Sequence, residues 1–180
     1  MQFQPMFDEG VKILNASGSK EWLCASEADT QRLAKQLAQQ LCLLNPSDAL
    51  QIQLQGNLGA GKTTFVRYLL QALGVKGRIK SPTYALVETY DDIRNHANLP
   101  LSFWHFDFYR FKDPVEWQEA GFRDIFAGPG VKLVEWPAMA ESELPIPDIA
   151  MHITVNSDNS RTVTVYAMTP IGKQVLFAFT

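Results

Sequence analysis

The sequence predicts a three-layer α/β domain whose central mixed sheet is parallel near residue 56 and ends in antiparallel strands. Three observations predict it: an alternating strand at residues 50–55, a glycine-rich turn directly after it, and an amphipathic helix after the turn. Further β-like segments supply the rest of the sheet, at residues 84–90, 102–109 and 131–136.

The length and composition fit one globular domain, with 180 residues of which 46% are apolar and 19% charged. We expect a lead-in segment over residues 1–20, with one short strand at 11–14, and a single domain over residues 21–180. With a net charge of −3, the protein as a whole has no positive electrostatic field that would attract nucleic acid. Cys24 and Cys42 suit neither a disulfide framework nor a metal motif, and no segment resembles a secretion signal or a membrane span. The expected location is therefore the cytoplasm.

The first half of the domain has clear element signals. Ser26 followed by Asp29 resembles a helix N-cap, and the leucine spacing after it predicts a helix over residues 27–44. The strand at 50–55 alternates Leu or Ile with Gln, so we expect one face to be wet or covered by a partner. The helix after the glycine-rich turn is expected to end at Gly74.

The second half is expected to be richer in strands. Asp113 and Pro114 resemble an N-cap and first helical residue, with Glu116 as the acid of a capping box, and predict a short helix that ends at Gly121. We expect antiparallel hairpins from three β-rich runs, at residues 149–156, 161–168 and 174–180.

Residues 56–63, GNLGAGKT, satisfy the phosphate-binding pattern G-x-x-x-x-G-K-[ST]. Its glycines let backbone N–H groups turn toward a phosphate, and Lys62 adds an ammonium for the β and γ phosphates. The Thr63 hydroxyl is placed to ligate a Mg²⁺ that bridges the same oxygens. The preceding strand and following helix make this a P-loop NTPase domain with a nucleoside triphosphate as ligand. The expected ligand-binding residues are Asn57, Leu58, Gly59, Ala60, Gly61, Lys62, Thr63 and Thr64.

Two strands supply the acid that a P-loop needs for Mg²⁺. Asp107 shares one face of an aromatic strand with His105, and Glu135 ends the apolar run VKLVE. The alternative for either acid is a solvent-facing position on a half-buried strand. Thr83, in the loop after the P-loop helix, is either a γ-phosphate contact or part of an ordinary turn. Trp136, which follows Glu135, either borders the base or packs in the core.

Five ordered blocks within residues 21–140 resemble the TsaE (YjeE) family of bacterial ATPases: SEADTQRLAKQLAQQL, GNLGAGKTT, KSPTYALVETY, HFDFYR and VEWP. The resemblance implies a Mg²⁺-dependent ATPase, slow alone and dependent on partners. It implies a requirement for the threonylcarbamoyl modification on adenosine 37 of tRNA. The implied partners are the TsaD and TsaB proteins, with tRNA reached indirectly through their complex and no membrane involved.

The resemblance also implies roles for individual residues. Thr63, Asp107 and Glu135 would serve Mg²⁺, Glu135 would be essential near the γ-phosphate of ATP, and Thr83 would lie in a switch-like loop. With Lys62, the two acids form the expected catalytic set. Similarity does not divide metal binding and water orientation between Asp107 and Glu135. The family often has an acid after the Trp-Pro pair, where this chain has Ala138. This difference puts in doubt only a supporting contact at that position and leaves the roles of the other site residues unchanged.

Several alternatives remain open from the residues. A P-loop small-molecule or nucleoside kinase also pairs a P-loop with an acidic strand end, but it needs a lid, and residues 91–100 carry only Arg94. A nucleotide-gated binding module with almost no hydrolysis is a further alternative, since no Gln is obviously placed to orient water. Arg110 and Arg123 are both candidate arginine fingers. A solvated turn is favoured over a phosphate-binding role for three nearby basic residues, Lys76, Arg78 and Lys80.

Overall fold

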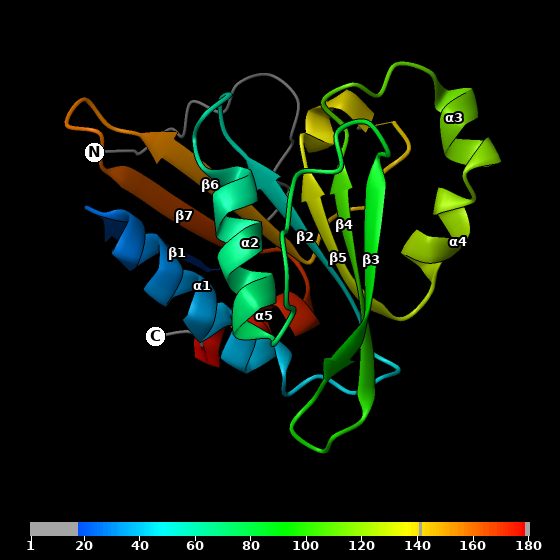
Figure 1. Cartoon of the computed structure of the whole chain (residues 1–180), viewed down its shortest axis with the longest axis horizontal. Helices are drawn as coiled ribbons and strands as arrows, with labels where there is room; N and C mark the ends of the chain where they lie inside the picture. Colours follow the sequence, from blue (N-terminus) through cyan, green and yellow to red (C-terminus); the bar gives the residue numbers. More distant parts are fainter. Residues whose placement is uncertain (1–17, 141, 179–180) are drawn as a thin grey trace.

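The computed structural model describes residues 18–140 and 142–178, within which seven strands form one mixed sheet (Figure 1). The strand order is β1-β7-β6-β2-β5-β4-β3. Neighbours β6, β2, β5 and β4 run parallel, whereas β1, β7 and β3 are antiparallel to their neighbours, which confirms the predicted mixed sheet. The strands are β1 (Ser19–Cys24), β2 (Ala49–Gln55), β3 (Val87–Arg94), β4 (Pro100–Asp107), β5 (Gly130–Glu135), β6 (Ile149–Val155) and β7 (Arg161–Ala167).

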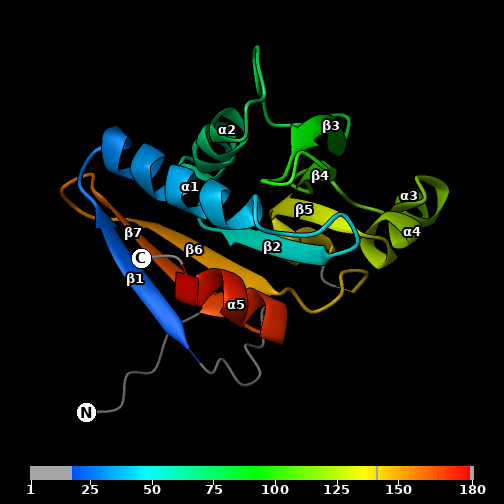
Figure 2. The same ribbon diagram turned by 90° about the horizontal axis from the view of Figure 1, so that it is seen from below.

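Helices cover both faces of the sheet, so the predicted three-layer architecture is confirmed (Figure 2). Phe103 and Leu133 pack in the cluster under α1 and α2, whereas the alternate residues Phe106 and Val134 pack in the cluster under α3 and α4. None of the helices in the described ranges is long and apolar enough to cross a membrane. The helices are α1 (Glu27–Leu41), α2 (Lys62–Ala72), α3 (Pro114–Glu119), α4 (Phe122–Ala127), the 3₁₀ helix η1 (Pro137–Ala140) and α5 (Pro170–Ala178).

The predicted helix signals are largely confirmed. Ser26 and Asp29 form a reciprocal capping box at the start of α1, and Gly74 follows α2 with a φ of 91°. The Asp113 side chain accepts a hydrogen bond from the Val115 N–H and caps α3. Helix α1 ends at Leu41, three residues earlier than expected. The backbone hydrogen bonds there span three residues instead of four, as in the bond from the Leu44 N–H to the Leu41 carbonyl.

The C-terminal prediction is right for two runs and wrong for the third. Strands β6 and β7 form the expected antiparallel hairpin, but the last run belongs to helix α5. The Thr169 hydroxyl accepts from the Gly172 N–H, and Pro170 is the first helical residue, so the run opens with helix-start chemistry that outweighs its β propensity. Burial of Val175 and Leu176 against the core then favours the helix.

Three other expectations differ from the structure. Residues 19 and 20, assigned to the lead-in, begin β1, and the strand expected at 11–14 lies outside the described residues. Helix α4 was not predicted. The wet face expected for β2 is wrong, because Gln51 and Gln53 are only 5% and 4% exposed at the centre of the sheet. This central position places the end of β2 beside the other functional strands.

Candidate nucleotide-binding site

The site lies where β2, β5 and β4 end side by side (Figure 1). Strand β5 lies between the other two, with Glu135 in register with Leu54 of β2 and with Asp107 of β4. The glycine-rich turn begins two residues after Leu54, at Gly56. The structure therefore brings the predicted turn and both predicted acids to one edge of the sheet, where open α/β sheets bind ligands.

The three glycines of the turn serve two different purposes. A Cβ on Gly56 would lie 2.4 Å from the carbonyl oxygen of Ile153, so this glycine lets the turn pass close to β6. Gly59 and Gly61 have φ values of 79° and 109°, which L side chains rarely adopt, yet a Cβ there would meet nothing within 4 Å. These two glycines therefore shape the backbone and leave open space beside it, as a phosphate cradle requires.

A cavity of about 390 Å³ opens beside this turn. It brings together most of the predicted site, namely Leu58, Gly59, Gly61, Lys62, Thr63, Thr64, Thr83, Asp107, Glu135 and Trp136. Two predicted residues do not line it: Ala60 is 1% exposed, and the backbone of Asn57 closes the turn by accepting from the Ala60 N–H. The candidate finger Arg110 lines this cavity, whereas Arg123 does not.

The sequence did not single out three further lining residues, Ser81, Tyr84 and Tyr109. Ser81 and Tyr84 flank Thr83 in the loop between α2 and β3, and Tyr109 stands two residues after Asp107. In the sequence, these three residues are distinguished only by lying close to Thr83 or Asp107. Loops lack the periodicity that shows which side chains point into a site. Tyr84 is 82% exposed, and the Arg110 guanidinium stacks 4.5 Å from its ring centre.

Both acids are buried, so the solvent-facing alternative is wrong. Glu135 is 2% exposed, with its Oε1 2.8 Å from Nε2 of His105 and its Oε2 accepting from the Thr63 hydroxyl at 2.9 Å. Asp107 is 3% exposed and accepts from the Ser81 hydroxyl and, at 3.0 Å, from the Tyr109 N–H. All four carboxylate oxygens thus have a fixed partner.

Lys62 is held between the turn and an aromatic ring. Its Nζ donates to the carbonyls of Gly56 and Asn57, at 2.6 and 3.0 Å, and lies 3.9 Å from the ring centre of Trp136. Burial lowers the pKa of Lys62, and the nearby charges of Glu135 and Asp107 partly oppose that change. Trp136 adopts a φ of 55°, a strained backbone for a bulky residue, which is typical of functional sites.

The Thr83 hydroxyl is buried and has no hydrogen-bond partner among the described residues. It lines the cavity together with Ser81 and the two acids. An unpaired buried hydroxyl is costly unless a ligand or ordered water satisfies it. This observation favours the ligand-contact interpretation of Thr83 over the ordinary turn.

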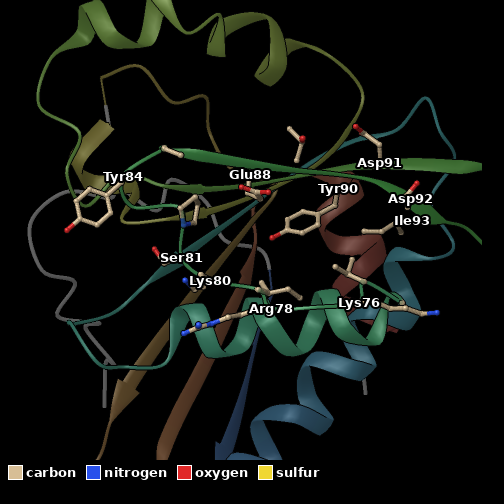
Figure 3. A pocket seen from close by; sticks show the side chains of 16 residues that line it. Lys76, Arg78, Lys80, Ser81, Tyr84, Glu88, Tyr90, Asp91, Asp92 and Ile93 are labelled. Atoms are coloured by element: carbon tan, nitrogen blue, oxygen red, sulfur yellow. The ribbon is translucent and has the colours of Figure 1, made fainter.

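The basic residues that follow α2 face a different cavity, of about 990 Å³, between their loop and β3 (Figure 3). Lys76, Arg78 and Lys80 are exposed on its loop side, opposite the acidic residues of β3. None of the three lines the cavity beside the P-loop, so they do not contribute to the candidate site.

A third cavity, of about 190 Å³, lies across the P-loop from the acids. Gly59, Gly61 and Thr64 line both this cavity and the larger one, so the P-loop separates the two. The other walls come from α1, β6 and β7, through Glu27, Thr30, Ile153, Arg161 and Val163.

The chain is similar to known proteins in both sequence and fold. The family model described as "Threonylcarbamoyl adenosine biosynthesis protein TsaE" matches residues 24–163. The tRNA threonylcarbamoyladenosine biosynthesis protein TsaE of Haemophilus influenzae is 40% identical over 148 residues, covering 82% of this chain and 89% of that protein. Its Bacillus subtilis counterpart is 34% identical over 148 residues, covering 82% and 85%. The crystal structure of Bacillus subtilus YdiB superposes with a TM-score of 0.70 at 26% identity, covering 90% of this chain and 94% of that chain.

Proposed function

Because the chain belongs to the TsaE family of threonylcarbamoyl adenosine biosynthesis proteins, we propose that it binds and hydrolyses ATP with Mg²⁺ in support of that tRNA modification at adenosine 37. One observation carries the proposal: an ammonium, a hydroxyl and two buried carboxylates face a single cavity beside two open glycines. These are the groups that phosphoryl chemistry in P-loop proteins requires. TsaD and TsaB are the proposed partners, with tRNA reached through them.

The donor set fits Mg²⁺, which binds proteins through one or two carboxylates together with substrate phosphates. Thr63, Asp107 and Glu135 would hold the ion, which neutralises charge on the β and γ phosphate oxygens. Because the Thr63 hydroxyl donates a hydrogen bond to Glu135, the lone pairs of its oxygen remain available to a cation. The buried, unpartnered hydroxyl of Thr83 would donate to the γ-phosphate.

The two cavities beside the P-loop suggest how the nucleotide lies. The triphosphate would occupy the larger one, where Lys62 would exchange its two carbonyl acceptors for phosphate oxygens. The nucleoside would occupy the smaller one, where Ile153 and Val163 offer apolar contacts and Glu27 offers a hydrogen-bond acceptor. In this arrangement Trp136 supports the phosphate side rather than the base.

The test of ATP hydrolysis is phosphate release from Mg·ATP with no added acceptor. A hydrolase releases phosphate under these conditions, whereas a kinase needs its acceptor. We expect Glu135→Ala to bind Mg·ATP within about threefold of the unaltered protein but to release phosphate about 100-fold more slowly, as for loss of one preorganised polar group at a reaction centre. If the variant turns over normally, Glu135 is a structural residue; if the unaltered protein releases no phosphate, the hydrolase proposal is wrong.

The partner proposal has its own support and its own test. Leu58 and Tyr84 are 75% and 82% exposed at the cavity, and exposed apolar side chains beside a site suit a docking partner. We expect co-purification with TsaD and TsaB to depend on bound nucleotide. Absence of any nucleotide-dependent complex would contradict the partnership and leave ATP hydrolysis standing.

A further inference from the structure

His105 lies on β4, two residues before Asp107, and is fully buried, with an exposed fraction of 0%. Its Nε2 lies 2.8 Å from Oε1 of Glu135, while its Nδ1 is buried without a hydrogen-bond partner in the described ranges. A carboxylate can only accept, so the Nε2–H of His105 donates to Glu135. His105 does not line the phosphate cavity and therefore does not touch the ligand.

This arrangement is costly for the fold. A buried polar atom that has lost water and gained no partner destabilises the native state. Phe103 and Phe106 occupy neighbouring positions of β4, are fully buried and leave no polar atom unpaired. Since a phenylalanine or leucine satisfies the packing of this strand elsewhere, packing alone does not explain an imidazole at position 105.

We propose that His105 is a positioning residue for Glu135, and this inference rests on the proposed ATP hydrolysis. The Glu135 side chain has several rotatable bonds, and hydrogen bonds on both of its oxygens fix its carboxylate plane. One of these bonds comes from Thr63, which is itself a proposed ligand of the metal. His105 supplies the bond that stays the same whether or not nucleotide is bound, and it directs Oε2 toward Thr63 and the cavity.

Asp107 shows why only one of the two acids needs such a residue. Its side chain is one carbon shorter, and the backbone N–H of Tyr109 already holds one oxygen at 3.0 Å. No backbone N–H holds Glu135 in the described structure; its hydrogen bonds come from the side chains of His105 and Thr63. Without the His105 side chain, Glu135 keeps only one of these two hydrogen bonds, the one from Thr63.

Three substitutions separate positioning from packing. His105→Gln places an amide N–H near the position of Nε2, His105→Asn reaches only the position of Nδ1, and His105→Leu removes both polar atoms. We expect the Gln variant to keep kcat within about threefold, and the Asn and Leu variants to lose about 10- to 100-fold, the range for a displaced catalytic group. The Kd for ATP without Mg²⁺ should stay within about threefold in all of them, because His105 does not line the cavity.

A readout independent of activity is the ¹⁵N spectrum of the histidine side chains. We expect His105 to show a protonated Nε2, and Glu135→Ala to shift the Nε2 signal. His152→Leu, at a half-buried position on β6, is the matched control and should leave kcat unchanged. If the Leu variant does not fold, the comparison of Gln with Asn carries the kinetic test.

Three results would overturn the inference: equal kcat for the Gln and Asn variants, ATP affinity that falls together with kcat, or an Nε2 without a proton. A chain that releases no phosphate even without substitution would instead contradict the proposed function, and the ¹⁵N spectrum would still decide the His105–Glu135 geometry.

Discussion

The two walls of the phosphate cavity are built differently. The strand wall, which comprises Thr63 and Glu135, joins helix α2 to strand β5, and its nearly inaccessible Glu135 is held from behind by His105 of β4. The loop wall, which comprises Ser81, Thr83 and Tyr84, joins the sheet through the Ser81 bond to Asp107, and Tyr84 is 82% exposed. The fold itself therefore fixes the strand wall, whereas the loop wall depends on a few side-chain contacts. The loop wall also contains the Thr83 hydroxyl, which has no hydrogen-bond partner among the described residues.

The largest expected effect concerns Lys62, which lies against the strand wall. Lys62→Ala should weaken Mg·ATP binding about 100-fold, because it removes a charged donor to the phosphates. Calorimetric titration measures this change. Lys132→Met is the control, since it removes an equally buried ammonium from β5 outside the cavity and should leave binding unchanged. Unaltered affinity in Lys62→Ala would show that the assigned cradle is wrong.

The next effect tests how firmly the turn is fixed to the sheet. Gly56→Ala should lower the free energy of unfolding by about 3 kcal/mol, because its Cβ meets the Ile153 carbonyl at 2.4 Å and its φ of 144° is strained. Gly59→Ala should cost only about 1 kcal/mol, since its Cβ meets nothing within 4 Å. Urea denaturation compares the two. Equal losses would contradict a turn anchored at Gly56.

A smaller effect is expected on the loop wall. Ser81→Ala removes one hydrogen bond to Asp107 and should weaken Mg·ATP binding about 3- to 10-fold. The free energy of unfolding should fall by about 1 kcal/mol, because one oxygen of the buried Asp107 carboxylate loses its partner. Ser157→Ala, in the exposed turn between β6 and β7, should change neither quantity. A stability loss as large as that of Gly56→Ala would mean that the loop wall is as firmly built as the strand wall.

The last effect lies outside both walls and concerns stability alone. Burial lowers the pKa of Lys132 to about 8, from an ordinary lysine value of 10.5, although its Nζ donates to the carbonyls of Gly128, Pro129 and Gly130. Between these two values the unfolded chain binds the extra proton, so stability rises with pH. The melting temperature of the unaltered protein relative to Lys132→Met should therefore rise by about 5 °C from pH 8 to 10.5. A difference that falls over this range would contradict the lowered pKa.

The sequence predicted the strand wall better than the loop wall, for a physical reason. Glycine spacing, strand alternation and an acid at the end of an apolar run are local signals, and they located Lys62, Thr63 and Glu135. The inward direction of Ser81 depends on where β4 places Asp107, 26 residues away, and no local pattern encodes that contact.

The sequence also failed to predict elements that depend on long-range contacts, strand β1 and helix α5. Within the described residues, strand β1 pairs only with β7, so that Trp22 lies opposite the distant Val163. The residues that precede β1 in the sequence are mostly polar or turn-forming. Helix α5 has β-branched and aromatic residues whose propensity favours a strand, but tertiary burial decides its conformation. Local patterns thus predicted the architecture around the P-loop, and long-range packing determined the sheet edge.

The pairing of β1 with β7 has a consequence for how the chain is made. Ser19 is synthesised well before its partner Tyr166. Contacts so distant in sequence form slowly, because a long loop must close first. The nascent chain can assemble the P-loop core while β1 is still unpaired, so β1 joins the sheet only after β7 has been made.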